Sequence, residues 1–323
     1  MKMTRREMIV TSGIPPALYI CGCLGGKDVS IYNSVGTDER GVYLLIAGSL
    51  LRSVEIGMRK EIAHNIRVES HGSVTIARLI LEGLKNPDII SLSDPILFDK
   101  MLGSEWYVEF ASNEIVIAYN DSTKNGRLIS EYSENNWYEN ILKNDIRVGI
   151  TDAEMDPLGY RTLFMLYLAS VYYGEDDIEE GILAKSLMFP ETELMSYFDI
   201  GAVDAVFVYK NMAVSRGYKY IELPPEINLG EPSKIKNWYS TAEYRFKNGD
   251  IVYGDCIKYG STISENDSDS VVLEVFKQHI MGEYIADFGF KIPEDYPRLI
   301  GKIPRDIERH ILEWKIRSPL QAY

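Results

Sequence analysis

From residue 41 onward, short apolar runs alternate with segments in which apolar side chains recur every three or four positions. The runs predict strands, and the wider spacing predicts helices. Strands are predicted at residues 42–47, 66–70, 88–93, 113–119, 147–151, 203–209, 219–223 and 250–257. Helices are predicted at residues 49–63, 73–84, 136–142, 159–173, 268–281 and 304–316, and another begins near residue 191. This alternation predicts an α/β fold with parallel, doubly wound sheets, whose ligands bind at the carboxyl ends of the strands.

Two glycine–serine pairs stand where a predicted strand gives way to a predicted helix. Gly48-Ser49 follows the first strand, and Gly72-Ser73 follows the second. The first turn of a helix has unpaired N–H groups and the positive end of the helix dipole, and glycine lets a ligand approach the backbone. Helix capping alone also explains a single pair. Two pairs at the same edge of a sheet favour an anion site that includes Gly48, Ser49 and Ser73.

A third junction of this kind carries an acidic residue. Asp156-Pro157-Leu158 lies between the strand at 147–151 and the helix at 159–173. Asp156 suits a helix N-cap and Pro157 suits the first turn, so capping is one explanation. The other is functional, because the helix dipole keeps a carboxylate ionised and such a carboxylate can bind a metal centre.

Two further positions are open to a structural or a functional interpretation. Glu191 and Glu193 begin a predicted helix, where the dipole favours acidic residues in any case. Tyr209 ends a buried strand, where its ring can cap the core or its hydroxyl can reach a cleft.

Composition narrows the function classes. A chain of 323 residues is long enough for two domains, and its formal net charge of −14 argues against a nucleic-acid partner, which needs clustered Lys and Arg. The four histidines are scattered, and the chain contains no nucleotide-binding loop, nucleophile elbow or zinc-protease motif. We therefore expect neither an enzyme nor a bound cofactor.

The N-terminus has the pattern of an export signal. A basic start with Arg5 and Arg6 precedes a moderately apolar stretch at 8–20, and Gly22 stands before Cys23. This pattern predicts a signal ending in a lipobox over residues 1–23, with Cys23 as the lipidated first residue of the mature protein. An uncleaved N-terminal anchor is the alternative. In both cases the folded part lies outside the cytoplasm at the outer face of the membrane, joined to it by a tether at 24–40.

Taken together, the junction motifs resemble those of the archaeal tungstate/molybdate-binding proteins that feed ABC transporters. The resemblance covers nearly the whole mature chain. It rests on Ala47-Gly48-Ser49-Leu50, Gly72-Ser73-Val74, the strand at 106–119, the segment 136–142, Asp156-Pro157-Leu158-Gly159-Tyr160-Arg161, Glu191-Thr192-Glu193-Leu194, Phe207-Val208-Tyr209-Lys210, and the segments 223–229 and 251–254.

The resemblance implies a two-lobed class II periplasmic-binding-protein fold. Each lobe is then a doubly wound mixed sheet flanked by helices, and two hinge crossings join the lobes over a cleft. The expected boundaries are 41–114 for lobe I, 115–224 for lobe II, and 225–323 for the return to lobe I and the C-terminal helix. We expect a monomer that delivers tungstate or molybdate to an ABC permease in the membrane.

The resemblance also implies the roles of individual residues. Gly48, Ser49, Ser73, the Asp156-Pro157-Leu158 turn and the Tyr209 hydroxyl would hold the oxo groups. The carboxylates of Asp156 and Glu191 would bind the metal itself and raise tetrahedral to octahedral coordination. Leu158 stands where the family usually has cysteine, and a family segment is missing before Glu191, which leaves Glu193 as the alternative ligand.

Two alternatives fit the same features. The departures from the family pattern could change the ligand to another tetrahedral oxyanion, such as sulfate or phosphate. A pair of lobes of this kind could also serve as an oxyanion-sensing module that does not take part in transport. The choice between tungstate and molybdate stays open, since the two ions have nearly the same size and charge.

Overall fold

The computed structural model describes residues 41–264 and 269–317. The predicted signal with Cys23 and the tether at 24–40 lie outside the described residues. Within the described part, no helix is both long and apolar enough to cross a membrane.

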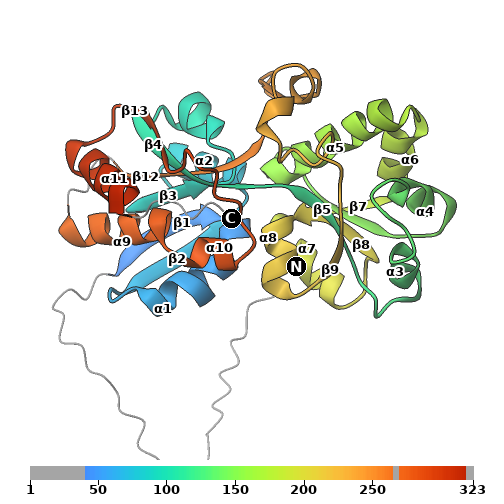
Figure 1. The fold of residues 1–323 in the computed structure, drawn as a ribbon, viewed down its shortest axis with the longest axis horizontal. Helices are drawn as coiled ribbons and strands as arrows, with labels where there is room; N and C mark the ends of the chain where they lie inside the picture. The colour runs from blue at the N-terminus through green and yellow to red at the C-terminus, as the bar shows by residue number, and fades with distance from the viewer. Residues whose placement is uncertain (1–40, 265–268, 318–323) are drawn as a thin grey trace, which may run out of the picture. The chain divides into compact units, whose positions relative to one another are not determined.

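The first sheet has six strands in the order β13-β4-β12-β3-β1-β2 (Figure 1). Its strands are β1 (Val42–Ala47), β2 (Ile66–His71), β3 (Ile89–Leu92), β4 (Trp106–Asn113), β12 (Ile257–Ile263) and β13 (Arg298–Gly301). β1 runs parallel to β2 and β3, whereas β12 is antiparallel to β3 and β4. All six residues of β1 are buried, as expected for a central strand covered on both faces.

The second sheet has five strands in the order β7-β6-β8-β5-β9. Its strands are β5 (Ile115–Tyr119), β6 (Val148–Thr151), β7 (Ser186–Phe189), β8 (Ala205–Tyr209) and β9 (Lys219–Glu222). β6 is parallel to β7 and β8, and β5 is antiparallel to β8 and β9. We call the first sheet with its helices lobe I and the second sheet with its helices lobe II.

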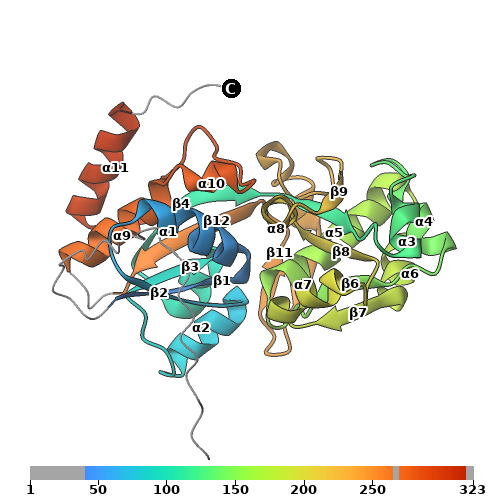
Figure 2. The same ribbon diagram turned by 90° about the horizontal axis from the view of Figure 1, so that it is seen from below.

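Helices flank both sheets. They are α1 (Arg59–Glu61), α2 (Ser73–Leu81), α3 (Lys124–Ile129), α4 (Trp137–Lys143), α5 (Pro157–Tyr173), α6 (Asp177–Lys185), α7 (Glu191–Asp199), α8 (Lys210–Arg216), α9 (Ser270–Met281), α10 (Tyr284–Asp287) and α11 (Arg305–Arg317). Figure 2 shows α2 below the first sheet. The predicted α/β fold with two lobes is confirmed.

The chain passes from lobe I to lobe II at a single residue. Glu114 separates β4 from β5, and its buried carboxylate forms ion pairs with Lys210 of α8 and with Lys291, which follows α10. Asn228, on the return passage, donates its side-chain amide to Glu114 Oε2 at 3.2 Å. Groups from both lobes and from the return passage therefore meet at this crossing.

The strand predicted at 250–257 is wrong. The segment is divided between β11 (Ile251–Tyr253), which pairs with β10 (Glu243–Arg245) in a separate hairpin, and the start of β12. Gly254 stands between them, so close to the chain that a Cβ there would lie 2.1 Å from the Tyr239 carbonyl oxygen. Gly254 and Asp255 interrupt the apolar pattern at this turn, and the prediction of one strand ran through them.

One other expected element differs from the structure, and one edge strand was not expected. The helix predicted at 49–63 is a short 3-10 turn at Gly48–Leu50 followed by a π-helical stretch at Ser53–Met58 and α1. The edge strand β7 has no counterpart among the predicted strands, because its four residues carry no clear alternation of apolar and polar side chains. Leu187 and Met188 are exposed in the structure.

The core of lobe I contains one buried histidine. His279 of α9 contacts the Ser91 hydroxyl at 2.8 Å through Nε2 and the Tyr284 hydroxyl at 2.9 Å through Nδ1. Burial lowers the pKa of His279 to about 4. The unfolded chain therefore binds a proton before the folded one does, and stability falls as the pH drops from 6.5 toward 4.

We expect His279→Gln to remove this part of the pH dependence. The lowered pKa corresponds to about 3 kcal/mol of unfolding free energy lost by pH 4. Chemical denaturation at pH 7.5 and pH 4.5 measures the loss in wild type and variant. His64→Gln, at a half-buried histidine beside Glu274, is the control and should behave as wild type. An unchanged pH dependence in His279→Gln would contradict the prediction.

Candidate functional site

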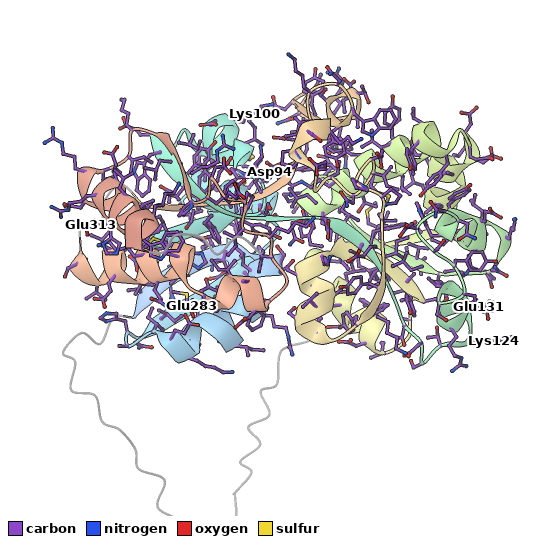
Figure 3. All side chains as sticks on the ribbon, in the orientation of Figure 1. Asp94, Lys100, Lys124, Glu131, Glu283 and Glu313 are labelled. Atoms are coloured by element: carbon purple, nitrogen blue, oxygen red, sulfur yellow. The ribbon has the colours of Figure 1, made fainter. Side chains whose placement is uncertain are left out.

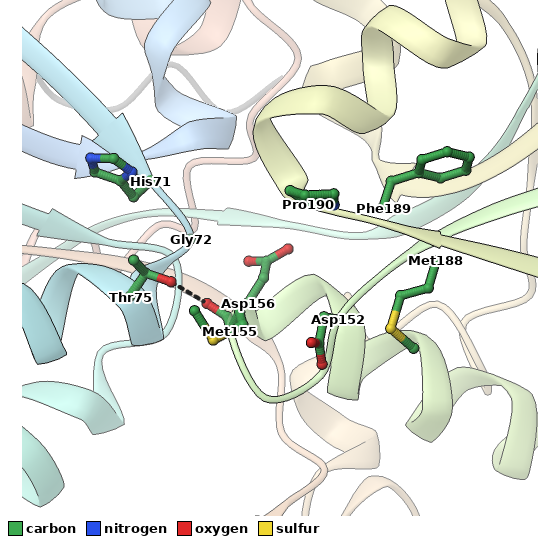
Figure 4. A pocket seen from close by; sticks show the side chains of 9 residues that line it. All are labelled: His71, Gly72, Thr75, Asp152, Met155, Asp156, Met188, Phe189 and Pro190. Carbon is green, nitrogen blue, oxygen red and sulfur yellow. Dashed lines mark hydrogen bonds between the residues drawn. The ribbon is translucent and has the colours of Figure 1, made fainter. Parts of the chain in front are cut away.

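A cavity of about 480 Å³ opens between the two lobes (Figure 4). Lobe I lines it with the end of β2 and the first turn of α2, and lobe II lines it with the β6–α5 junction and the β7–α7 junction. The lining residues are His71, Gly72, Thr75, Asp152, Met155, Asp156, Met188, Phe189 and Pro190. The carboxyl ends of parallel strands therefore face each other across the cavity, as ligand sites of such sheets do.

The lobes touch directly at the edge of this cavity. The Thr75 N–H and hydroxyl both donate to the Met155 carbonyl oxygen, at 3.3 and 3.2 Å. A Cβ at position 72 would lie 2.5 Å from the same oxygen and 3.1 Å from the Asp156 Cβ. Only glycine permits this approach, which explains Gly72 at the start of α2.

The second glycine–serine pair forms a helix start with unused donors. Ser73 is the first residue of α2 and is fully buried, and its hydroxyl accepts a hydrogen bond from Ser93 N at 2.9 Å. Within the described residues, the N–H groups of Ser73 and Val74 have no acceptor. These donors are available to an anion.

The first glycine–serine pair, Gly48-Ser49, forms hydrogen bonds with both lobes. Ser49 lies in the 3-10 turn that begins at Gly48, and its hydroxyl accepts from the Tyr259 hydroxyl of β12 at 3.0 Å. Its carbonyl oxygen accepts from the Asn211 side chain of α8 at 2.7 Å. Ser49 therefore stands at the point where lobe II reaches lobe I.

Asp156 is buried between the lobes without the bonds of a cap. It occupies the N-cap position of α5, but its side chain makes no capping hydrogen bond. Its Oδ2 is buried and has no hydrogen-bond partner among the described residues. Burial raises the pKa of Asp156 to about 6. The capping interpretation therefore does not account for Oδ2, a buried polar atom without a partner among the described residues.

Pro157 and Leu158 form the first turn of α5, as the sequence predicts. Both are buried, and the Leu158 carbonyl accepts from the Thr162 hydroxyl at 2.7 Å. Tyr209 ends β8 and is fully buried, and its hydroxyl oxygen accepts from Arg161 Nη1 at 2.8 Å. Burial raises the pKa of Tyr209 well above its ordinary value, so the hydroxyl keeps its proton.

The two glutamates occupy different positions on α7. The helix begins at Glu191, directly after Pro190, which lines the cavity. Glu193 is exposed. The prediction for the Glu191 carboxylate lies outside the described side chains.

Of the residues that line the cavity, only Asp156 was predicted as a site residue. Three residues that contact predicted ones were not predicted either. Arg161 is a buried cation on α5, Ser93 follows β3 as Ser73 follows β2, and Asn211 lies two residues after Tyr209. Ser93 could have been found, because it ends a third strand at the same edge of the sheet. The described residues contain no group of three or more His, Cys, Asp or Glu that could hold a metal ion.

Comparison with known proteins places the chain in a family. The model of the family described as bacterial extracellular solute-binding protein matches residues 51–246, more than half of the chain. The chain belongs to this family.

Relatives of this solute-binding protein include named archaeal proteins. A putative ABC transporter molybdenum-binding protein of Haloferax volcanii is 36% identical over 285 residues, covering 88% of this chain and 89% of the relative. The molybdate/tungstate-binding protein WtpA of Pyrococcus abyssi is 28% identical over 330 residues, covering 90% and 94%. The resemblance inferred from the motifs is confirmed.

Solved structures support the fold. The periplasmic molybdate-binding protein of Azotobacter vinelandii superposes with a TM-score of 0.52 at 13% identity, over 78% of this chain and 99% of that one. The predicted class II periplasmic-binding-protein fold is thereby confirmed.

We expect Asp156→Asn to stabilise the ligand-free solute-binding protein at pH 8. Because the folded-state pKa is raised, the neutral carboxyl stabilises the fold at low pH and this contribution is lost as the pH rises through about 6. A pKa of about 6 in the folded protein, against the ordinary value of 3.8, means that the ionised carboxylate lowers the unfolding free energy by about 3 kcal/mol at pH 8. In chemical denaturation, the unfolding free energy of the variant should exceed that of wild type at pH 8, and the difference should shrink toward pH 4. Asp145→Asn, at an exposed aspartate of lobe II, is the control; an equal gain there would contradict the assignment.

Proposed function

We propose that this chain is the solute-binding protein of an ABC importer and that it captures tungstate or molybdate in the cleft between its lobes. The observation that carries the proposal is the buried Asp156 carboxylate, whose Oδ2 has no partner among the described residues. It faces the start of α2, where a Cβ on Gly72 would meet the Asp156 Cβ at 3.1 Å. In the described part of the chain, backbone N–H groups without an acceptor and a carboxylate oxygen without a partner thus lie next to each other.

The two kinds of group suit two parts of the same ligand. The N–H groups at Ser49, Ser73 and the start of α5, with the Tyr209 hydroxyl, are hydrogen-bond donors for oxo groups. A carboxylate is a donor of electron pairs and suits the metal. We assign Asp156 and Glu191 to the metal, giving octahedral coordination.

This division explains why the site contains a carboxylate at all. An ionised carboxylate repels sulfate or phosphate, whose central atom accepts no further ligand at such a site. A hexavalent metal centre is a hard acid that accepts oxygen donors. The named relatives from Haloferax volcanii and Pyrococcus abyssi support the same ligand class.

The partners follow from the family and from the N-terminus. An ABC permease would receive the oxyanion, and lipidation of Cys23 would hold the monomer at the outer face of the membrane. We propose no catalytic step.

Isothermal titration calorimetry tests the ligand. We expect molybdate and tungstate to bind one to one with nanomolar or tighter affinity, and sulfate to bind at least ~1,000-fold more weakly. Asp156→Asn should weaken molybdate binding on the order of 100-fold. Affinity in wild type should rise with pH through about 6, because the ionised carboxylate is the one that coordinates.

The same titrations can contradict the proposal. If Asp156 instead donates a proton to a plain oxyanion, affinity falls as the pH rises through about 6, and Asp156→Asn retains binding. Equal affinity for sulfate would also refute the proposal. Asp145→Asn should change affinity by no more than about twofold.

X-ray absorption at the tungsten edge tests the coordination. We expect an octahedral spectrum for the wild-type complex and for Glu193→Gln, and a return toward the tetrahedral spectrum of free tungstate in Glu191→Gln. The two glutamates are matched controls for each other. A tetrahedral spectrum in wild type would refute carboxylate coordination, and a loss confined to Glu193→Gln would move the ligand to that residue.

A further inference from the structure

Arg161 is a buried cation that crosses from one lobe to the other. It lies in the second turn of α5 in lobe II and is 3% exposed. Its Nη1 donates to the carbonyl oxygen of Ser93 in lobe I at 2.6 Å, and its Nη2 lies 3.4 Å from Asp94 Oδ2. The preceding residue, Tyr160, donates its hydroxyl to the same Asp94 oxygen at 2.5 Å. Figure 3 shows Asp94 near the meeting of the two lobes.

The same guanidinium determines how the Tyr209 hydroxyl can be used. Arginine has only donors, so its bond to Tyr209 at 2.8 Å occupies the hydroxyl oxygen as an acceptor. The hydroxyl proton then remains available, and no described residue accepts it. Since Tyr209 is fully buried, this donor is shielded from bulk solvent and is available to a ligand in the cleft.

Arg161 therefore makes two kinds of contact, one between the lobes and one within lobe II. Its contacts to Ser93 and Asp94 exist only when the lobes are together, whereas its contact to Tyr209 lies within lobe II. We propose that Arg161 is a positioning residue that latches the closed lobes and, in the same arrangement, directs the Tyr209 hydroxyl proton to the bound oxyanion. The second half of this assignment rests on the proposed function, and the first half does not.

Variants separate the two halves. Arg161→Lys keeps the positive charge but cannot satisfy the three acceptors at once, because an ammonium lacks the planar fork of a guanidinium. Asp94→Asn weakens the latch without touching Tyr209. Tyr209→Phe removes the hydroxyl and leaves the latch. Arg147→Lys, at a half-exposed arginine that pairs with Asp204 within lobe II, is the matched control.

Binding kinetics with molybdate test the whole proposal. We expect Arg161→Lys to raise the dissociation rate about tenfold or more, and Arg147→Lys to leave it unchanged. In a double-mutant cycle, Arg161→Lys should lose a large part of its effect on affinity when Tyr209 is already Phe, because Arg161 then has no hydroxyl to orient. Fold changes that simply multiply would overturn the action through Tyr209.

Small-angle scattering tests the latch without any ligand. We expect ligand-free Arg161→Lys and Asp94→Asn to have a larger radius of gyration than the ligand-free wild type and Arg147→Lys. An unchanged radius in both variants would overturn the latch. If Arg161→Lys fails to fold, Asp94→Asn carries this test alone, and if the wild type fails to bind molybdate, the proposed function fails while the scattering result still decides the latch.

Discussion

The close approach of the lobes at Gly72 is the constraint on which the cleft depends. A side chain there would collide with the Met155 carbonyl, so only glycine lets the first turn of α2 reach the β6–α5 junction. That contact brings unpaired backbone donors of lobe I against the Asp156 carboxylate of lobe II. The Thr75–Met155 and Ser93–Arg161 bonds lie along the same boundary and depend on the same separation.

The positive charge beside the cleft comes from a few local groups, whereas the protein as a whole is negatively charged. The chain carries a formal charge of −14, and Asp156 adds a buried carboxyl to the site itself. Arg161 opposes it from one turn further along α5, and the helix dipoles add partial positive charge. A ligand that accepts the Asp156 lone pair removes the cost of its burial, so affinity and selectivity can come from the same group.

Local patterns predicted the strand–helix junctions, and with them the positions of Ser73 and Asp156. The same patterns could not decide whether Asp156 caps its helix, since a cap and a ligand occupy the same position in the sequence. Arg161 and Asn211 were not predicted as site residues because their acceptors, at positions 93 and 49, come from the other lobe. The error at Gly254 has a similar cause, because the turn there depends on a distant carbonyl.

The two passages between the lobes are very unequal in length. The outward passage is Glu114 alone, whereas the return runs from the end of β9 to the start of β12 and contains the β10–β11 hairpin. Both neighbouring strands are paired and two lysines hold the Glu114 carboxylate, so this crossing contains no slack. The return passage is therefore long enough to absorb a change in its length without altering the one-residue crossing at Glu114.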